Sequence, residues 1–313
     1  MVCCGAMAMP PHLPLKYGQA KPQAEGGDFH RSSDGRRLWL FTRSWEPSEP
    51  WATLMMIVHG TVDHSGVYSE LGQFLAAQGV AVFASDMRGW GRSDGEPLYL
   101  DNIKSFMGDI LADYEHIHAA SPYSQLRARF LLGKSIGGLI TAWAAAEHPD
   151  KWTGLIGLSG AYQVDPSVKP PFLLLKMVEM LSYFAPKMPL KPPFDPKLIV
   201  SDEEALQEWE QDPLVSRGKI TVGYICEMLR LQGELDSVLQ MHMPALMLWG
   251  TGDQVVTEAG HQMVLDASNH PESEFLKYPG GYHNLLAEPQ LKESVMRDIL
   301  GWLRKVVARA GGE

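Results

Sequence analysis

A serine between glycines, in residues 133–138 (Gly-Lys-Ser-Ile-Gly-Gly), has the surroundings of a catalytic nucleophile. This segment follows a short apolar run at 130–132 and precedes a helix-forming run at 139–147. A buried strand, a tight turn and a helix in that order predict a nucleophile elbow, which pushes Ser135 Oγ out of the packed sheet. Glycine is expected at 133 and 137 because a Cβ there would collide with neighbouring backbone. The alternative is a strand-to-helix turn with no chemical role.

A serine hydroxyl becomes an effective nucleophile only beside a general base that a third group orients. Asp253 follows a strand-like run at 245–249, and His283 follows another at 274–278. Both are well placed, because ligands of open α/β sheets gather at the carboxyl ends of the strands. The chain order Ser135, Asp253, His283 is the serine–acid–histidine order of α/β hydrolases. The alternatives are an Asx-turn residue for Asp253 and a surface side chain for His283.

The tetrahedral intermediate of acyl transfer carries an oxyanion that needs fixed hydrogen-bond donors. In this fold one donor is the N–H of the residue after the nucleophile, here Ile136. The other comes from the loop after an earlier strand, and we expect it to be the Thr61 N–H. His59 opens that loop and is expected to shape it. Asp86, followed by Arg88 and Arg92 as candidate ion-pair partners, is a weaker candidate for the acid.

The rest of the chain has to position these residues. Uninterrupted apolar runs predict strands buried on both faces, and apolar residues three or four positions apart predict helices. Because the two alternate, the sequence predicts an α/β fold with a mostly parallel central sheet and helices on both faces. The predicted strands are 37–45 (as a hairpin), 52–58, 80–84, 128–132, 154–158, 245–249 and 274–278, and the predicted core helices are 68–77, 103–120, 139–147 and 291–308.

The alternation of strands and helices stops between residues 161 and 242. This stretch is rich in proline and has three helical segments, at 172–184, 202–211 and 219–239. We interpret residues 161–242 as an inserted helical cap, called the cap segment below, and residues 28–160 and 243–313 as the core. Residues 1–27, with several prolines and glycines, are predicted to be a flexible lead-in.

The first helix of the cap segment is apolar around most of its circumference. One interpretation is that it packs on the core. The other is that it lines an acyl channel and contacts lipid aggregates, since methionines adapt to varied chains and large apolar surfaces mark lipid contacts. It is too short to span a bilayer. The residues predicted to bind substrate on this helix are Phe172, Leu175, Met177, Met180 and Leu181.

Together these motifs resemble the monoacylglycerol lipase and lysophospholipase group of the α/β hydrolases. Residues 59–68 (HGTVDHSGVY) are similar to its His-Gly-x-Gly-Glu-His-Ser-x-Arg-Tyr block, and residues 86–95 (DMRGWGRSDG) to its Asp-x-Arg-Gly-x-Gly-x-Ser-x-Gly loop. Residues 212–214 (DPL), 252–253 (GD) and 282–283 (YH) match further blocks. The resemblance runs from about residue 28 to the C-terminus, and implies an α/β-hydrolase that cleaves esters of single-chain lipids.

Four positions depart from the pattern of that group. Val62 replaces a glycine, Asp63 a glutamate and Val67 an arginine, and Leu286 stands where some members have a second histidine. In those relatives the polar groups line the glycerol end of the pocket, so the resemblance implies ester cleavage but not glycerol recognition. Asp63 keeps a carboxylate, and we expect it to contact the substrate.

Composition narrows the function further. The formal net charge of −10 argues against nucleic acid as a partner, and no apolar run is long enough for a transmembrane helix. The three cysteines, Cys3, Cys4 and Cys226, cannot form a disulfide framework, which predicts a reducing, cytoplasmic location. Peripheral contact with membranes or lipid droplets through the cap segment is a further expectation. Cys3 and Cys4 are either an incidental pair or a site of thioester-linked lipid.

We therefore expect a serine esterase that converts monoacylglycerol to fatty acid and glycerol through an acyl-enzyme on Ser135. This chemistry requires no metal and no cofactor. Four alternatives stay open: a lysophospholipase, a small phenolic-ester esterase, an acyltransferase, and a weakly hydrolytic receptor whose cap moves when a partner binds. The oligomeric state is not determined by the sequence.

Overall fold

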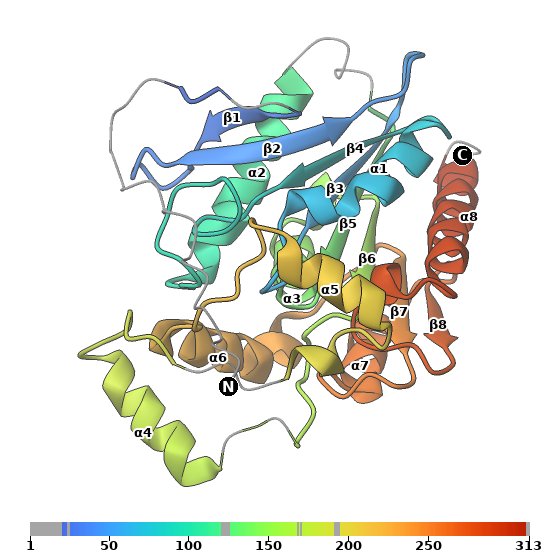
Figure 1. Cartoon of the computed structure of the whole chain (residues 1–313). Helices are drawn as coiled ribbons and strands as arrows, with labels where there is room; N and C mark the ends of the chain where they lie inside the picture. Colours follow the sequence, from blue (N-terminus) through green and yellow to red (C-terminus); the bar gives the residue numbers. More distant parts are fainter. Residues whose placement is uncertain are drawn as a thin grey trace.

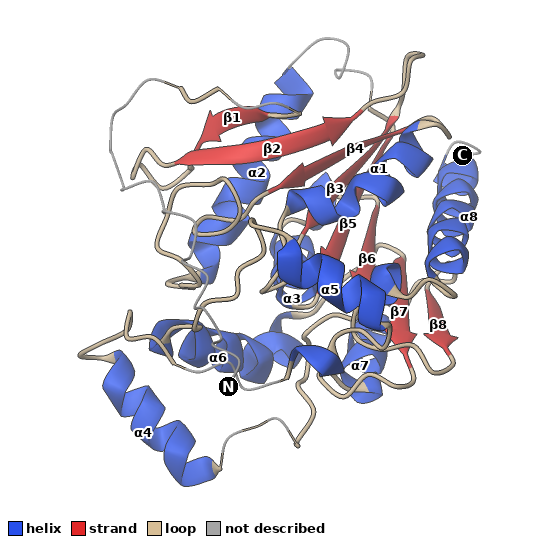
Figure 2. Ribbon diagram, viewed as in Figure 1, coloured by secondary structure: helices blue, strands red, loops and turns tan. Residues whose placement is uncertain are grey.

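One mixed sheet organises the chain in the computed structural model, which describes residues 21–23, 26–119, 126–167, 169, 171–190 and 195–310. Within those residues the strand order is β1-β2-β4-β3-β5-β6-β7-β8 (Figures 1 and 2). The pairs β1–β2 and β2–β4 are antiparallel and the others are parallel, so the predicted mostly parallel sheet is confirmed. The strands are β1 (Asp28–Arg31), β2 (Trp39–Trp45), β3 (Thr53–Val58), β4 (Val80–Ser85), β5 (Ala128–Lys134), β6 (Gly154–Leu158), β7 (Ala245–Gly250) and β8 (Glu274–Tyr278).

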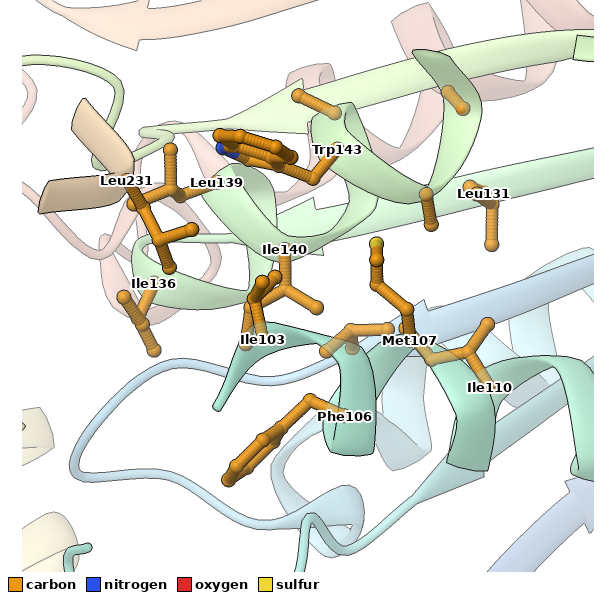
Figure 3. Close-up of a cluster of buried hydrophobic side chains, with 14 of the residues drawn as sticks. Ile103, Phe106, Met107, Ile110, Leu131, Ile136, Leu139, Ile140, Trp143 and Leu231 are labelled. Atoms are coloured by element: carbon orange, nitrogen blue, oxygen red, sulfur yellow. The ribbon is translucent and has the colours of Figure 1, made fainter. Parts of the chain in front are cut away.

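Helices cover both faces of this sheet because the central strands are apolar on both sides. In β3, Leu54 and Met56 belong to a buried cluster with α2 (Ile103–Ala119) and α3 (Ile136–Glu147). The alternate residues Met55 and Ile57 belong to a second cluster with α1 (Ser69–Ala76) and α8 (Lys292–Ala310). Burying each such side chain stabilises the fold by about 1.5–3 kcal/mol. Figure 3 shows part of the first cluster, in which side chains of α2 face those of α3.

The segment between β6 and β7 contributes helices but no strand of the sheet among its described residues. These helices are α4 (Phe172–Ser182), α5 (Glu203–Gln211) and α6 (Val222–Val238), close to the three predicted positions. Helix α6 packs on the core, since Leu231 and Leu235 are buried in the cluster that contains α3. Helix α4 lies beyond α6, away from the sheet (Figure 1). That residues 161–242 form a separate domain stays a prediction.

One helix, α7 (Glu258–Ser268), lies in a stretch for which the sequence predicts no element. Of its buried residues only Val264 has an aliphatic side chain, and caps define both of its ends. The Thr257 side chain accepts a hydrogen bond from the Gly260 N–H, and Asn269 closes the helix at φ 42°. The Thr257 cap is the signal that could have located it.

Two predictions concern residues that the structure leaves undescribed. Most of the predicted lead-in, including Cys3 and Cys4, lies outside the described residues, so its flexibility and its lipidation stay predictions.

Among the helices that are described, none combines the length and the hydropathy needed to cross a bilayer.

Candidate active site

The elbow is built by β5, a one-residue turn and α3. Ser135 adopts φ 53° and ψ −122°, a conformation that non-glycine residues rarely occupy and that is often found at functional sites. Its N–H donates to Leu158 O at 3.2 Å, and its C=O accepts from the Ala161 N–H at 2.8 Å. A Cβ on Gly137 would lie 2.1 Å from Val58 O, so the predicted need for glycine there is confirmed.

Ser135, Asp253 and His283 meet at the carboxyl end of the sheet, although they are far apart in the chain. His283 Nε2 lies 3.0 Å from Ser135 Oγ, and His283 Nδ1 lies 2.8 Å from Asp253 Oδ2. The other oxygen of Asp253 accepts from the N–H groups of Val255 and Val256, at 2.7 and 3.1 Å. The structure therefore brings the three predicted residues into a single hydrogen-bonded series.

The charge of Asp253 determines which nitrogen of His283 carries the proton. Burial alone would raise the pKa of Asp253, but His283 and the two backbone N–H groups outweigh it, so this pKa lies below its ordinary value. An ionised carboxylate can only accept hydrogen bonds, so His283 Nδ1 must donate to it. In the neutral ring, Nε2 is then left as an acceptor for the hydroxyl proton of Ser135.

The loop after β3 brings Thr61 to the same place. A Cβ on Gly60 would lie 3.3 Å from Ser135 Cβ, so this loop runs directly beside the nucleophile. Thr61, Ser135 and Ile136 line one pocket. No acceptor within the described part of the chain takes the N–H of Thr61 or of Ile136. Both groups are therefore available to a ligand at Ser135.

Two side chains from neighbouring elements hold this loop. Trp90 Nε1 donates to Thr61 O at 2.5 Å. His59 Nδ1 donates to Gly60 O at 2.7 Å, and His59 Nε2 accepts from the Met87 N–H at 2.9 Å. Burial lowers the pKa of His59, which keeps the ring neutral and leaves Nε2 free to accept. The prediction that His59 shapes the loop agrees with these contacts.

Asp86 is a structural anchor in this loop region. Its carboxylate accepts from the N–H groups of Ser65 and Arg92, at 2.6 and 2.7 Å. Arg88, suggested by the sequence as its partner, instead pairs with Asp109 at 2.6 Å. Asp86 thus ties two loops together through their backbones and takes no part in the contacts around Ser135.

The pocket that reaches Ser135 is small and mostly apolar, with a volume of about 60 Å³. Helix α6 forms a wall of it through Tyr224, Ile225, Met228 and Leu229. These residues recur at helical spacing, and that stripe is the sequence signal that could have identified the wall. The complete lining is Thr61, Ser135, Ile136, Ala161, Val164, Lys169, Ile220, Tyr224, Ile225, Met228, Leu229, Val255 and Val256.

The predicted channel residues of α4 do not line this pocket, so their contact with substrate stays a prediction. Phe172, Met177 and Met180 are 74%, 57% and 63% exposed. Leu175 and Leu181 are half-buried, and Leu181 packs against the core cluster. The reason is that α4 packs on the outer side of α6, which lies between it and the pocket.

Asp63 also does not line this pocket, so its contact with substrate stays a prediction. Asp63 is 1% exposed, and its Oδ2 accepts from Lys134 Nζ at 2.7 Å, so it forms a buried ion pair directly beside the nucleophile. Burial would raise the pKa of Asp63, but the ammonium of Lys134 outweighs this and keeps it below its ordinary value. The lysine inside the Gly-x-Ser-x-Gly motif is the signal that the sequence offered for this pair.

Two of the positions that depart from the family pattern, Val67 and Leu286, line a second and larger cavity of about 530 Å³. Lys134 and Asn284, the neighbours of Ser135 and His283 in the chain, also line it, together with Trp209 of α5.

Within the described ranges, no three His, Cys, Asp or Glu side chains are grouped to hold a metal ion.

Comparison with known proteins assigns the chain to a family. A family model described as serine aminopeptidase, S33 (Hydrolase_4) matches residues 49–290. The chain belongs to this family. The predicted resemblance and the α/β-hydrolase fold are thereby confirmed, and the match spans most of both the core and the cap segment.

Relatives in this family include a monoglyceride lipase of Mus musculus, 28% identical over 282 residues that cover 90% of this chain and 91% of the relative. A caffeoylshikimate esterase of Arabidopsis thaliana is 29% identical over 283 residues, covering 88% and 84% of the two chains. The crystal structure of a monoacylglycerol lipase of Paleococcus ferrophilus superimposes with a TM-score of 0.76 at 25% identity, over 86% of this chain and 98% of that one.

Proposed function

We propose that this protein is a serine ester hydrolase of single-chain lipids, with monoacylglycerol as its main substrate. The observation that carries the proposal is the continuous series Ser135–His283–Asp253 at the wall of an apolar pocket. Membership of the family, and relatives named monoglyceride lipase or monoacylglycerol lipase in animals and bacteria, support the substrate class.

In the proposed mechanism, Ser135 Oγ attacks the ester carbonyl while His283 Nε2 takes its proton. The ionised carboxylate of Asp253 stabilises the imidazolium that forms. The N–H groups of Thr61 and Ile136 hold the oxyanion, and each such donor typically contributes ~3 kcal/mol. His283 then protonates the leaving alcohol, and water activated by the same nitrogen releases the fatty acid from Ser135.

The two cavities suggest how a substrate lies. The apolar pocket beside α6 suits the acyl chain, and each buried methylene contributes ~0.8 kcal/mol to its binding. The larger cavity is lined by Lys134 and Asn284 but not by Ser135 or His283, and we assign the alcohol part to this side of the nucleophile. The apolar pocket is far smaller than the roughly 300–1,000 Å³ typical of ligand sites, so a long acyl chain needs more room than this pocket offers.

A substrate panel tests the proposal. We expect purified protein to hydrolyse monoacylglycerols with a kcat/KM at least about tenfold above that for lysophosphatidylcholine, a difference of about 1.4 kcal/mol in free energy. Release of fatty acid from each ester, measured by mass spectrometry, gives the rates. Preference for the lysophospholipid would move the protein to a different ester class.

The leading alternative is an esterase of small phenolic esters. The small pocket and the loss of polar groups at Val67 and Leu286 favour it, as does the relative named caffeoylshikimate esterase. A caffeoyl or feruloyl ester in the same panel decides between the two, because the better substrate has the higher kcat/KM. Acyl transfer is tested by adding excess alcohol, since a transferase gives a new ester in place of free acid.

We further propose that α4 mediates peripheral contact with membranes or lipid droplets. Its side chains Phe172, Leu173 and Met177 are each more than half exposed, and exposed apolar side chains grouped on one helix are typical of surfaces that contact lipid or protein. The variant Phe172→Ser/Leu173→Ser/Met177→Ser is expected to lose co-sedimentation with phosphatidylcholine vesicles. Glu179→Gln, on the same helix, should sediment as wild type. Equal sedimentation of the triple variant would contradict the proposal.

A further inference from the structure

We propose that the hydroxyls of Thr61 and Tyr224 act as a pair that supplies a third hydrogen-bond donor to the oxyanion. Tyr224 lies in the first turn of α6, so the cap segment completes a site whose other donors belong to the core. The inference rests on the proposed function, because it concerns the intermediate of acyl transfer at Ser135.

The geometry places both hydroxyls beside the nucleophile. Thr61 Oγ1 and Tyr224 Oη are 2.5 Å apart, a short hydrogen bond between two side chains that are 8% and 2% exposed. Both residues line the pocket that contains Ser135 and Ile136. Thr61 therefore presents its N–H and its side-chain oxygen in the same region.

The number of protons shows that one donor is unused. Two hydroxyl groups carry two protons, and the bond between them uses only one. Neither oxygen has another hydrogen-bond partner among the residues that the structure describes. A buried donor without an acceptor costs about 1–3 kcal/mol, so the second proton favours an acceptor that enters the pocket. The carbonyl oxygen of an ester, which becomes an oxyanion, is such an acceptor.

The relative acidity of the two groups indicates the direction of the pair. A phenol is a much stronger acid than an aliphatic alcohol, so Tyr224 O–H donates to Thr61 Oγ1. Burial raises the pKa of Tyr224 above its ordinary value, so the phenol keeps its proton at neutral pH. Thr61 O–H is then free to donate, and accepting the bond from the phenol strengthens it as a donor.

Thr61 is also held firmly enough to serve as a fixed donor. Trp90 Nε1 binds its carbonyl oxygen at 2.5 Å, and Tyr224 binds its side chain. The rings of Trp90 and Tyr224 pack against each other with centroids 6.3 Å apart. Donors fixed before the reaction stabilise developing charge without reorganisation, which is the property of an effective oxyanion site.

Steady-state kinetics of Thr61→Val, Tyr224→Phe and the double variant test the inference. Each change removes a hydroxyl and keeps the backbone N–H of residue 61. We expect kcat to fall by about 10- to 100-fold with KM nearly unchanged, because the bond to a charged oxygen forms only in the transition state. The kcat of the double variant should be no lower than that of the less active single variant, because the two hydroxyls act as a unit. Thr61→Ser should restore kcat.

A second measurement separates this role from a structural one. Affinity for a trifluoromethyl ketone, which forms a tetrahedral adduct with the serine, should fall by the same factor as kcat. Tyr162→Phe is the matched control, because Tyr162 is equally buried and its hydroxyl has no partner in the described residues. It should keep wild-type kcat and wild-type affinity for the ketone.

The outcomes distinguish the two proposals. If wild type is active and both Tyr224→Phe and Thr61→Val keep the wild-type kcat, the proposal of a third donor is overturned. The proposed hydrolase function is not affected by that result. A loss confined to KM, or losses that multiply in the double variant, would also overturn the third donor. A wild type without esterase activity would overturn both proposals. If Tyr224→Phe folds poorly by thermal melting, Thr61→Val alone decides.

Discussion

Ser135→Ala is expected to lower kcat for ester hydrolysis by about 10⁶-fold, the size of loss found when the serine of such a triad is removed. The variant keeps the elbow and the pocket, so substrate still binds, but no oxygen remains to form the acyl-enzyme. The same change should abolish covalent labelling by a fluorophosphonate, which reacts with the activated hydroxyl. Labelling is read on a gel, and hydrolysis by fatty-acid release.

The control for this experiment is Ser237→Ala, an exposed serine near the far end of α6 that should label as wild type does. Weak labelling of wild type, or equal labelling of Ser135→Ala, would rule out the proposed mechanism. Intact labelling together with absent ester turnover would point to the weakly hydrolytic receptor instead.

Asp253→Asn is expected to lower kcat by about 10⁴-fold while the protein stays folded. An amide nitrogen in place of the carboxylate Oδ2 would donate to His283 Nδ1, so the ring proton would move to Nε2. That nitrogen could then no longer accept the proton of Ser135. The amide oxygen can still accept from the N–H groups of Val255 and Val256, so we expect the loop to be retained.

Rates and thermal melting, measured on the same preparation, separate these effects. Asp266→Asn, an exposed acid on α7, is the matched control and should have wild-type kcat. If Asp253→Asn turned over substrate at the wild-type rate, the orienting acid would have to be another residue.

The sequence was most informative where backbone geometry restricts residue type. At the elbow, only glycine fits beside the carbonyl of Val58, and this requirement is visible in the motif itself. The parallel strands, β3 to β8, were also predictable, mainly because a strand covered on both faces needs uninterrupted apolar residues. Residues 37–45 were predicted as a hairpin but form the single strand β2, whose partner β1 was not predicted. Asp253 and His283 could be located from the parallel strands, since each lies in the loop that follows one of them.

The sequence was less informative where the answer depends on which side of a helix faces inward. Helix α4 is apolar all round, so its composition could not show that α6 lies between it and the pocket. Asp63 stands where the resembled group has a glutamate, but its partner Lys134 is 71 positions away in the chain and only folding brings the two together. Helix α7 was missed because its buried residues are mainly small or polar, and because its Thr257 cap was not recognised in the sequence.

The buried bond between Lys134 and Asp63 has an evolutionary consequence. Losing either partner alone would leave an unpaired charge in the interior and lower the free energy of unfolding by about 3–5 kcal/mol. That is a large fraction of the stability of a typical domain. These two positions cannot drift independently, although 71 positions of the chain, with α1, β4 and α2, separate them. A lineage that exchanges the lysine inside the nucleophile motif must replace the aspartate at nearly the same time, so the two positions should vary together among descendants.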